Sequence, residues 1–331
     1  MKLQDKRFSV APMMDWTDRH CRYFHRLLTT RAQLYTEMVT SAAIINGPRQ
    51  RLLAYDASEH PVVLQLGGSE PDDLAKCARI AEDAGYDEIN LNVGCPSERV
   101  QKGAFGACLM REPELVADCV EAMRLAVKIP VTVKCRLGVD YQEPRQSLFE
   151  FVEMVSRAGC RTFIIHARKA WLRGLSPKEN RDVPPLDYQI VYDVKRKWPQ
   201  FHISINGGIT TMEQVKEHLP HVDGVMMGRA AYQTPWILSS IDREIYAADQ
   251  GPATRVIAVE RFMPYMEAEL ATGTPLNAMT KHVLGLFNGL SGARSFRRHL
   301  SENAVRAGAG LDVVREALDF VRQSEPEREA A

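Results

Sequence analysis

The stretch "PVVLQLGGSEPDDLAKCARIAEDAGYDEINLNVG", residues 61–94, decides the fold because it contains a strand, a helix and a second strand in succession. Residues 61–68 and 88–94 are apolar on both faces, as is typical of strands that are covered on both sides. Residues 71–85 carry acidic side chains in the first turn and end at a glycine, which predicts an amphipathic helix between the strands.

The same alternation recurs along most of the chain. Amphipathic patterns at 112–127, 146–159 and 210–219 predict further helices, the last with a threonine positioned to cap its start. Strand followed by helix, repeated eight times, predicts an α/β fold of the TIM (β/α)8 barrel type, with a doubly wound open sheet as the alternative. The predicted strands are residues 8–14, 32–38, 61–68, 88–94, 131–138, 162–168, 202–208 and 224–229.

The strand pattern stops near residue 240. Helical spacing follows at 253–273, 278–290, 292–308 and 311–323. We therefore predict a barrel domain of residues 1–240 and a small all-α domain of residues 241–331.

Composition narrows the class of protein. The 331 residues include 42 basic and 42 acidic side chains, so the formal net charge is zero. Any attraction to nucleic acid must therefore come from local patches of positive charge. No run of 18 apolar residues occurs and the N-terminus lacks the apolar region of a signal peptide, so we expect a cytoplasmic protein. The seven cysteines contain no C-x-x-C pair, which argues against a disulfide framework and a structural zinc site.

Glycines lie at the ends of the last two predicted strands, in "NGGI" (206–209) and "GRAA" (228–231). Glycine lets backbone N–H groups approach an anion, and in barrels this position is a frequent phosphate site. Ordinary turns with a surface arginine are the alternative. We predict phosphate binding by Asn206, Gly207, Gly208, Gly228 and Arg229, because two neighbouring strand ends share the pattern.

Other strand ends carry side chains suited to a flat heterocycle. The methionines at the end of the first predicted strand could form an apolar floor, although plain core methionines fit equally well. A lysine flanked by apolar residues must point to water, an anion or a ligand. A lone strand histidine is usually structural, unless it shares a rim with other polar groups. Flavin mononucleotide (FMN) fits this combination. The residues concerned are Pro12, Met13, Met14, Gln65, Lys134 and His166.

Cys95 and Asn92 lie at the end of the fourth predicted strand, facing the same rim. A free thiol is mostly protonated at neutral pH, so Cys95 can donate a proton, or act as a nucleophile if deprotonated. Beside a reduced flavin the proton donor is the more useful role. The glycines of residues 102–107 suggest a flexible cover that brings Cys95 into place.

Several of these motifs together resemble one family. "APMMDWTDRHCRYFHR", "NLNVGCPSERVQKGAFGACLM", "VTVKCRLG" and "INGGI" resemble the tRNA-dihydrouridine synthases, and "RKAWLRGLSPKENRDVPPLDY" is similar to the bacterial A-type members. The resemblance implies an FMN-binding catalytic barrel and a tRNA-binding helical domain. It also implies NADPH as reductant and uridines 20 and 20a of the tRNA D-loop as substrate. Reduced FMN would deliver hydride from N5 to uracil C6, and Cys95 would protonate C5.

The resemblance also implies roles for individual residues. Cys95 matches the catalytic acid. The FMN positions of the family match Pro12, Met13, Met14, Gln65, Lys134, His166, Asn206, Gly207, Gly208, Gly228 and Arg229. Positions that contact tRNA match Asn92, Lys178, Arg181, Arg294 and Arg297.

Two local patches could hold RNA. Residues 168–181 and 281–306 each contain five basic side chains and one acidic side chain. Trp171 and Phe296 interleave aromatic rings with this charge, as RNA-binding surfaces often do. A solvated helix face is the alternative for any charged run, but two such patches favour a clamp on RNA.

Three other functions are the alternatives. An FMN barrel acting on a free pyrimidine would need neither the helical domain nor the basic patches. A non-enzymatic RNA-binding protein on a barrel scaffold would not bind flavin. A metal hydrolase would need a cluster of His and Asp at the strand ends, which the sequence lacks. We expect a monomer without an obligate protein partner.

Overall fold

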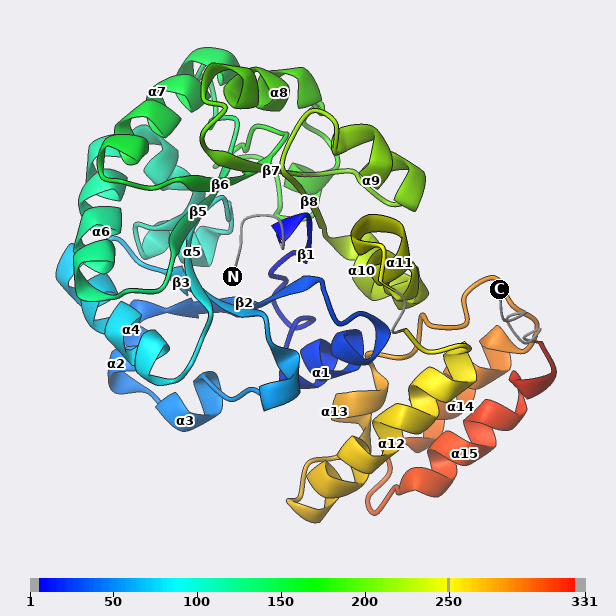
Figure 1. The fold of residues 1–331 in the computed structure, drawn as a ribbon. Coiled ribbons are helices and arrows are strands. Elements are labelled where there is room, and N and C mark those ends of the chain that lie inside the picture. Colours follow the sequence, from blue (N-terminus) through cyan, green and yellow to red (C-terminus); the bar gives the residue numbers. More distant parts are fainter. Residues whose placement is uncertain (1–5, 249–250, 325–331) are drawn as a thin grey trace. The chain divides into compact units, whose positions relative to one another are not determined.

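Eight parallel strands close into a barrel in the computed structural model, which describes residues 6–248 and 251–324 (Figure 1). Each strand pairs with the next along the chain, and β1 pairs with β8. This closure excludes the open doubly wound sheet. The strands are β1 (Phe8–Val10), β2 (Gln33–Thr40), β3 (Val62–Gly67), β4 (Glu88–Val93), β5 (Val131–Arg136), β6 (Thr162–His166), β7 (His202–Asn206) and β8 (Gly224–Met227).

Each predicted strand overlaps one observed strand, and most observed strands end earlier. The first ends at Val10 rather than at residue 14. Pro12 has no N–H to donate to a strand ladder, so apolar character continues there without strand structure. Because all eight strands are parallel, the residues just past each strand lie on the same side of the barrel. We call this C-terminal end the barrel mouth.

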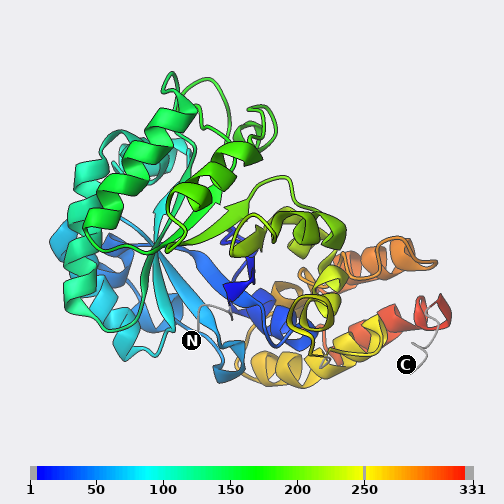
Figure 2. The ribbon, with the colours of Figure 1, turned by 45° about the horizontal axis from the view of Figure 1, so that its top comes forward.

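Helices lie outside the ring of strands (Figures 1 and 2). The helices predicted over 71–85, 112–127, 146–159 and 210–219 are confirmed, and Thr211 caps the last of them by accepting a hydrogen bond from the Gln214 N–H. The helices are α2 (Ser41–Asn46), α3 (Arg49–Leu52), α4 (Pro71–Asp83), α5 (Glu98–Lys102), α6 (Pro113–Ala126), α7 (Pro144–Arg157), α8 (Tyr188–Lys197) and α9 (Met212–His218), with 3-10 turns η2 (Ala57–Glu59), η3 (Gly106–Arg111) and η4 (Glu179–Arg181).

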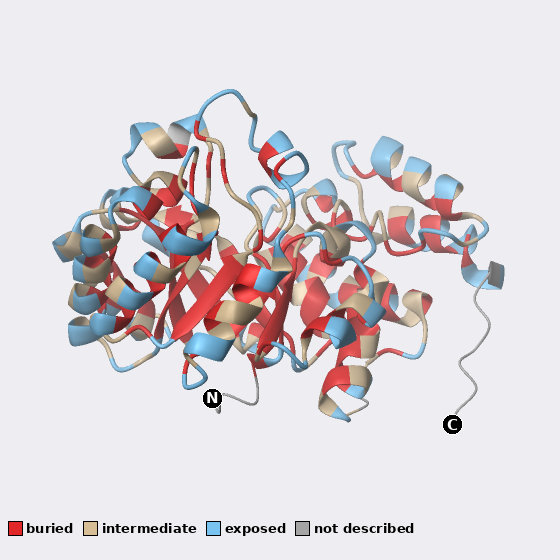
Figure 3. Cartoon of the chain, turned by 90° about the horizontal axis from the view of Figure 1, so that it is seen from above, coloured by how far each residue is buried: buried red, intermediate tan, exposed pale blue. Residues whose placement is uncertain are grey.

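The strands are buried, whereas the outer faces of the helices are exposed (Figure 3). Ala11, Tyr35, Val63, Ile164 and Met226 pack together in the interior. Polar side chains are also buried on the inward faces of the strands, and they lead to the barrel mouth.

A second compact unit comprises residues 15–32 and the described residues from 229 onward, and the barrel unit comprises the described residues up to 14 and residues 33–228. This division differs from the predicted boundary at residue 240, because α1 and the segment after β8 cluster with the C-terminal helices. The second unit contains α1 (Arg19–Leu28), α10 (Arg229–Gln233), α11 (Ile241–Tyr246), α12 (Arg255–Ala271), α13 (Leu276–Thr280), α14 (Ala293–Asn303) and α15 (Leu311–Asp319), with 3-10 turns η5 (Pro235–Ser240) and η6 (Arg322–Ser324).

One predicted helix is largely wrong. Residues 278–290 have helical spacing, but α13 ends at Thr280 and turns follow to residue 290. Gly285 lies so close to another backbone segment that a Cβ there would be 2.1 Å from the Gln233 carbonyl oxygen. This backbone contact within the second unit competes with a continuous helix.

Candidate functional site

Five consecutive strands carry a polar side chain near their C-terminal ends, at the barrel mouth. Gln65 lies on β3, Asn92 on β4, Lys134 on β5, His166 on β6 and Asn206 on β7. Asn92 is the register partner of Lys134, and His166 is the register partner of Asn206. The barrel therefore brings together residues that are far apart in the sequence.

A column of hydrogen bonds descends from the mouth through the barrel interior. Asn92 Nδ2 donates to Gln65 Oε1 at 2.9 Å, and Gln65 Nε2 donates to Asn90 Oδ1 at 2.8 Å. Asn90 Nδ2 donates to the Thr132 hydroxyl at 2.9 Å, which donates to Glu88 Oε1 at 2.7 Å. We call these five residues the barrel column. Every donor in it points toward the Glu88 carboxylate.

Glu88 anchors the column at the opposite end of the barrel. It forms a buried ion pair with Lys6 and accepts hydrogen bonds from Gln33 and Tyr35. Burial and the neighbouring carboxylate raise the pKa of Tyr35, so its hydroxyl stays a donor. A carboxylate can only accept, so Glu88 fixes the direction of each amide above it.

The upper end of the column holds Cys95. Asn92 Oδ1 accepts the backbone N–H groups of Gly94 at 3.1 Å and Cys95 at 3.0 Å. The Cys95 carbonyl oxygen accepts the Ala107 N–H at 2.9 Å. Gly106 has φ +77°, and a Cβ there would be 2.6 Å from that carbonyl oxygen. The backbone around half-buried Cys95 is thus held by hydrogen bonds on both sides. One of these bonds comes from Ala107, at the C-terminal end of the segment 102–107 that the sequence suggested as a flexible cover.

Lys134 and His166 supply donors of different kinds. Lys134 Nζ donates to Asn206 Oδ1 at 3.1 Å, and Asn206 Nδ2 donates to the Met226 carbonyl oxygen at 2.8 Å. Burial, with a smaller contribution from Arg136, lowers the pKa of Lys134 to about 8. Burial and the nearby cations lower the pKa of His166 well below 6.5, so its imidazole is neutral at physiological pH.

The glycines after β7 are closely packed against side chains, whereas the glycine after β8 has open space around it. Gly207 and Gly208 have φ values of +115° and +72°, which other residues rarely adopt, and a Cβ on Gly207 would be 2.6 Å from the His166 ring. At Gly228 the nearest atom to a Cβ would be Ala11 Cβ, at 3.9 Å. Pro12 and Met13 are half-buried, and Met14 is 55% exposed. A neutral imidazole, an ammonium, an amide and the open backbone at Gly228 fit a flavin with its phosphate.

Arg136 belongs to the site although the sequence interpretation did not include it. Its side chain is 3% exposed. Its Nε donates to the Gly94 carbonyl oxygen at 3.0 Å, and its Nη1 donates to those of Asn180 at 2.8 Å and Lys169 at 3.2 Å. Arg136 therefore ties the segment that carries Cys95 to the loop after β6. The alternation of Thr132, Lys134 and Arg136 along β5 is the signal that could have identified it.

Comparison with known proteins agrees with this geometry. The family model "Dihydrouridine synthase (Dus)" matches residues 9–322. The chain belongs to the dihydrouridine synthase family. The family reduces uridine in tRNA to dihydrouridine.

Named relatives match along nearly the whole chain. The chain is 61% identical over 320 residues to the "tRNA-dihydrouridine(20/20a) synthase" of Yersinia pestis, covering 96% of this chain and 92% of the relative. It is 60% identical over 316 residues to the protein of that name from Escherichia coli strain K12, covering 95% and 91%.

Solved structures show a similar fold at low sequence identity. A 2-naphthoyl-CoA reductase complex aligns with a TM-score of 0.54 and 11% identity, over 71% of this chain and 49% of that one. Morphinone reductase aligns with a TM-score of 0.52 and 12% identity, over 75% and 87%. Both likenesses support the barrel fold alone.

The other predicted site residues of this dihydrouridine synthase lie in both units. Lys178 and Arg181 are exposed on the loop after β6. In the second unit, Arg229 begins α10, while Arg294 is exposed and Arg297 is half-buried on α14.

One predicted surface aromatic is wrong. Phe296 is 0% exposed and packs against Phe287 with ring centroids 4.7 Å apart, because it lies on the inward face of α14. Arg297 Nη1 bonds to Asn288 Oδ1. Trp171, the other predicted aromatic, is half-buried and lies on the loop after β6.

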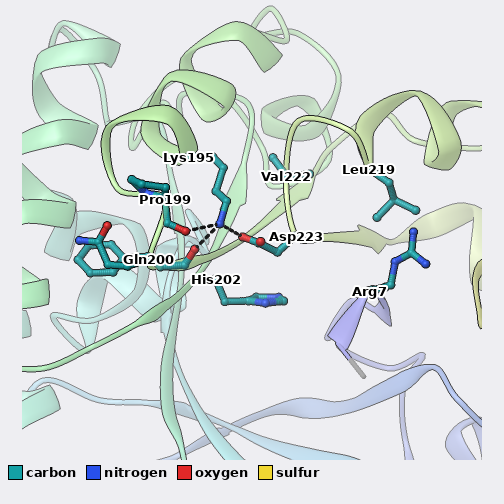
Figure 4. Close-up of a pocket in the computed structure, with 9 residues that line it drawn as sticks. Arg7, Lys195, Pro199, Gln200, His202, Leu219, Val222 and Asp223 are labelled. Atoms are coloured by element: carbon teal, nitrogen blue, oxygen red, sulfur yellow. Dashed lines mark hydrogen bonds and ion pairs between the residues drawn. The ribbon is translucent and has the colours of Figure 1, made fainter. Parts of the chain in front are cut away.

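A different pocket lies at the N-terminal end of the synthase barrel, opposite the mouth (Figure 4). Its volume is about 320 Å³. Lys195 Nζ bonds to Asp223 at 2.7 Å and to the carbonyl oxygens of Pro199 and Phe201, so the pocket's lysine is occupied by protein oxygens. Among the described residues, no group of three or more His, Cys, Asp or Glu could hold a metal ion, and no helix is long and apolar enough to cross a membrane.

Proposed function

We propose that this protein reduces uridines 20 and 20a of tRNA to 5,6-dihydrouridine, with FMN as prosthetic group and NADPH as reductant. The observation that carries the proposal is the identity of about 60% with relatives of that name over nearly the whole chain. The geometry of the barrel mouth supports the same chemistry. We further propose that the protein acts as a monomer in the cytoplasm.

The FMN site would use the polar rim of the barrel. Gln65, Lys134 and His166 would hold the ring, with the segment Pro12–Met14 beside it. Asn206, Gly207, Gly208, Gly228 and Arg229 would hold the phosphate. When bound, FMN supplies the hydride for uracil C6. Lys134 suits its electron-rich edge, because the ammonium lies at the mouth and donates to the neutral Asn206 amide oxygen.

Cys95 would provide the proton. Its thiol is half-exposed at the mouth, and its backbone is held by Asn92 on one side and by Ala107 on the other. A fixed donor can reach one carbon of a bound ring with little reorganisation, which favours transfer from Sγ to uracil C5.

Asn92 would position the uracil with its one remaining N–H. An amide group has two N–H donors and one oxygen. The Asn92 oxygen already accepts two backbone N–H groups, and one of its N–H groups bonds to Gln65. The second N–H is left to donate to a uracil carbonyl oxygen.

The tRNA would be held by basic side chains of both units. Lys178 and Arg181 in the barrel unit, and Arg294 and Arg297 on α14, would contact phosphates. The target uridine must leave its stack to reach the mouth, and a loop nucleotide does this at low cost.

Turnover of the purified protein tests the proposal. We expect flavin absorbance, and dihydrouridine in unmodified tRNA after addition of NADPH, detected by nucleoside mass analysis. A transcript with cytidine at positions 20 and 20a serves as the control and should gain no dihydrouridine. Colourless protein that cannot be loaded with FMN would favour the RNA-binding alternative, and reduction of a free pyrimidine but not of tRNA would favour the small-substrate alternative.

A further inference from the structure

Two aromatic side chains meet on the loops that follow β5 and β6. Tyr141 is 92% exposed, and its ring makes an edge contact with Trp171 at a centroid distance of 5.3 Å and an interplanar angle of 85°. Lys169 Nζ lies 5.6 Å from the centre of the Trp171 ring. Single exposed aromatic residues are common on protein surfaces. The rigidity and the surroundings of this pair distinguish it.

The loop that carries Trp171 is fixed by a buried asparagine. Asn180 is 0% exposed, and its side chain accepts the Trp171 N–H at 2.7 Å and donates to the Trp171 carbonyl oxygen at 2.9 Å. A β-bridge joins Val139 to Ala170. A surface that is ordered before binding loses little entropy when a ligand arrives.

The loop of Tyr141 is fixed to the same loop. The Asp140 N–H donates to the Ala170 carbonyl oxygen at 2.8 Å, and Asp140 Oδ1 accepts the Leu172 N–H at 2.8 Å. Tyr141 directly follows Asp140 in the sequence. The backbone segments that carry the two rings are therefore joined to each other.

The aromatic pair adjoins the segment that carries Cys95. Gln101 Nε2 donates to the carbonyl oxygens of Pro96 and Leu172, each at 2.8 Å. Pro96 directly follows Cys95, and Leu172 directly follows Trp171. A single side-chain nitrogen thus bridges the chain beside the thiol and the chain beside the aromatic pair.

The charge around the pair favours an anionic partner. Asp140 pairs with Arg111, and Glu179 accepts the Ser176 N–H at 2.8 Å, so these carboxylates are engaged within the protein. The side chains of Arg173 and Lys178, on the same loop as Trp171, are exposed.

We infer that Tyr141 and Trp171 form a stacking surface for an unpaired RNA base adjacent to the uridine that enters the barrel mouth. The inference rests on the proposed function and names a further part of the same substrate. Exposed rings with basic neighbours suit single-stranded nucleic acid, because every base offers a π-face and every nucleotide offers a phosphate. The surface would hold the neighbouring nucleotide while the uridine is extruded.

Equilibrium binding of unmodified tRNA to the FMN-loaded enzyme tests this inference. We expect Tyr141→Ala to weaken binding about 5- to 150-fold, the range for loss of one base stack, and Tyr141→Phe to retain it. Leu125→Ala is the matched control, since Leu125 is 84% exposed on α6 and its loss should leave binding unchanged. Tyr141 makes little contact with the core, so thermal unfolding of the alanine variant should match wild type.

The salt dependence separates stacking from charge. Tyr141→Ala should keep the wild-type slope of log affinity against log salt, whereas Lys178→Ala should reduce it by about 0.7 for a lost contact to single-stranded phosphate. If the Tyr141→Ala variant binds tRNA as tightly as the wild type, and the wild type makes dihydrouridine, then the stacking inference is wrong but the proposed function stands. A wild-type enzyme that makes no dihydrouridine would instead overturn the proposed function.

Discussion

Thr132→Val tests whether the barrel column supports the mouth. Valine keeps the shape of threonine inside the barrel, where Thr132 is 1% exposed, but it removes the hydroxyl. The Asn90 N–H then loses its acceptor at 2.9 Å, and Glu88 loses a donor at 2.7 Å. The unpaired Asn90 N–H costs about 1–3 kcal/mol. Glu88 keeps its contacts with Lys6, Gln33 and Tyr35 and adds little to this loss. We expect that loss in the free energy of unfolding measured by urea titration.

The consequence should also reach the mouth. Without its anchor, the Asn90 amide no longer fixes Gln65, so we expect weaker FMN binding in a titration of the ligand-free protein. Thr132→Ser keeps the hydroxyl and should retain FMN affinity despite a lost methyl group. Thr162→Val, on β6 and 8% exposed, is the control outside the column. If the serine variant binds FMN less tightly than the valine variant, packing rather than the hydrogen-bonded column supports the site.

Three further predictions concern charge, backbone and RNA. Burial lowers the pKa of Lys134 from 10.5 to about 8. Between pH 8 and pH 10.5, Lys134 therefore holds a proton in the unfolded chain but not in the folded, ligand-free chain. Its free energy of unfolding should therefore rise from pH 8 to 10.5 relative to Lys134→Met, and parallel pH curves would contradict this. Gly207→Ala places a Cβ 2.6 Å from the His166 ring at a φ of +115° and should cost about 1–3 kcal/mol of stability. It should also reduce the amount of bound FMN, measured by absorbance. Normal FMN content would refute the close packing of Gly207 against His166. Arg294→Ala combined with Arg297→Ala should weaken tRNA binding and lower its salt slope by about one unit per lost phosphate contact, while NADPH-driven flavin reduction stays normal; equal loss of flavin reduction would make these arginines structural.

The fold was predictable because its signals are local. Apolar runs and amphipathic helices alternate visibly, and polar residues such as Lys134 and His166 stand out at the ends of apolar strands. Parallel strands of a barrel all end on one side, so these residues could be grouped without knowing any contact. Their predicted roles toward FMN and tRNA stay predictions.

The contacts within the site could not be predicted, because they depend on register between distant strands. Asn90 meets Thr132 because these residues are partners between β4 and β5, and nothing in either segment specifies that pairing. Similarly, the helical spacing around Phe296 does not say which face of α14 is buried. The turns at 281–290 follow from the close approach of Gly285 to Gln233, which is also a non-local contact.

Cys95→Ala provides the most direct test of the proposed proton donor. The variant, loaded with FMN and reduced without oxygen, is mixed with unmodified tRNA, and dihydrouridine is quantified in a single turnover. We expect FMN content and tRNA affinity to match wild type, because the Cys95 backbone contacts with Asn92 and Ala107 do not involve the thiol. We expect almost no dihydrouridine on the wild-type timescale, and product formation at the wild-type rate would show that the proton comes from elsewhere.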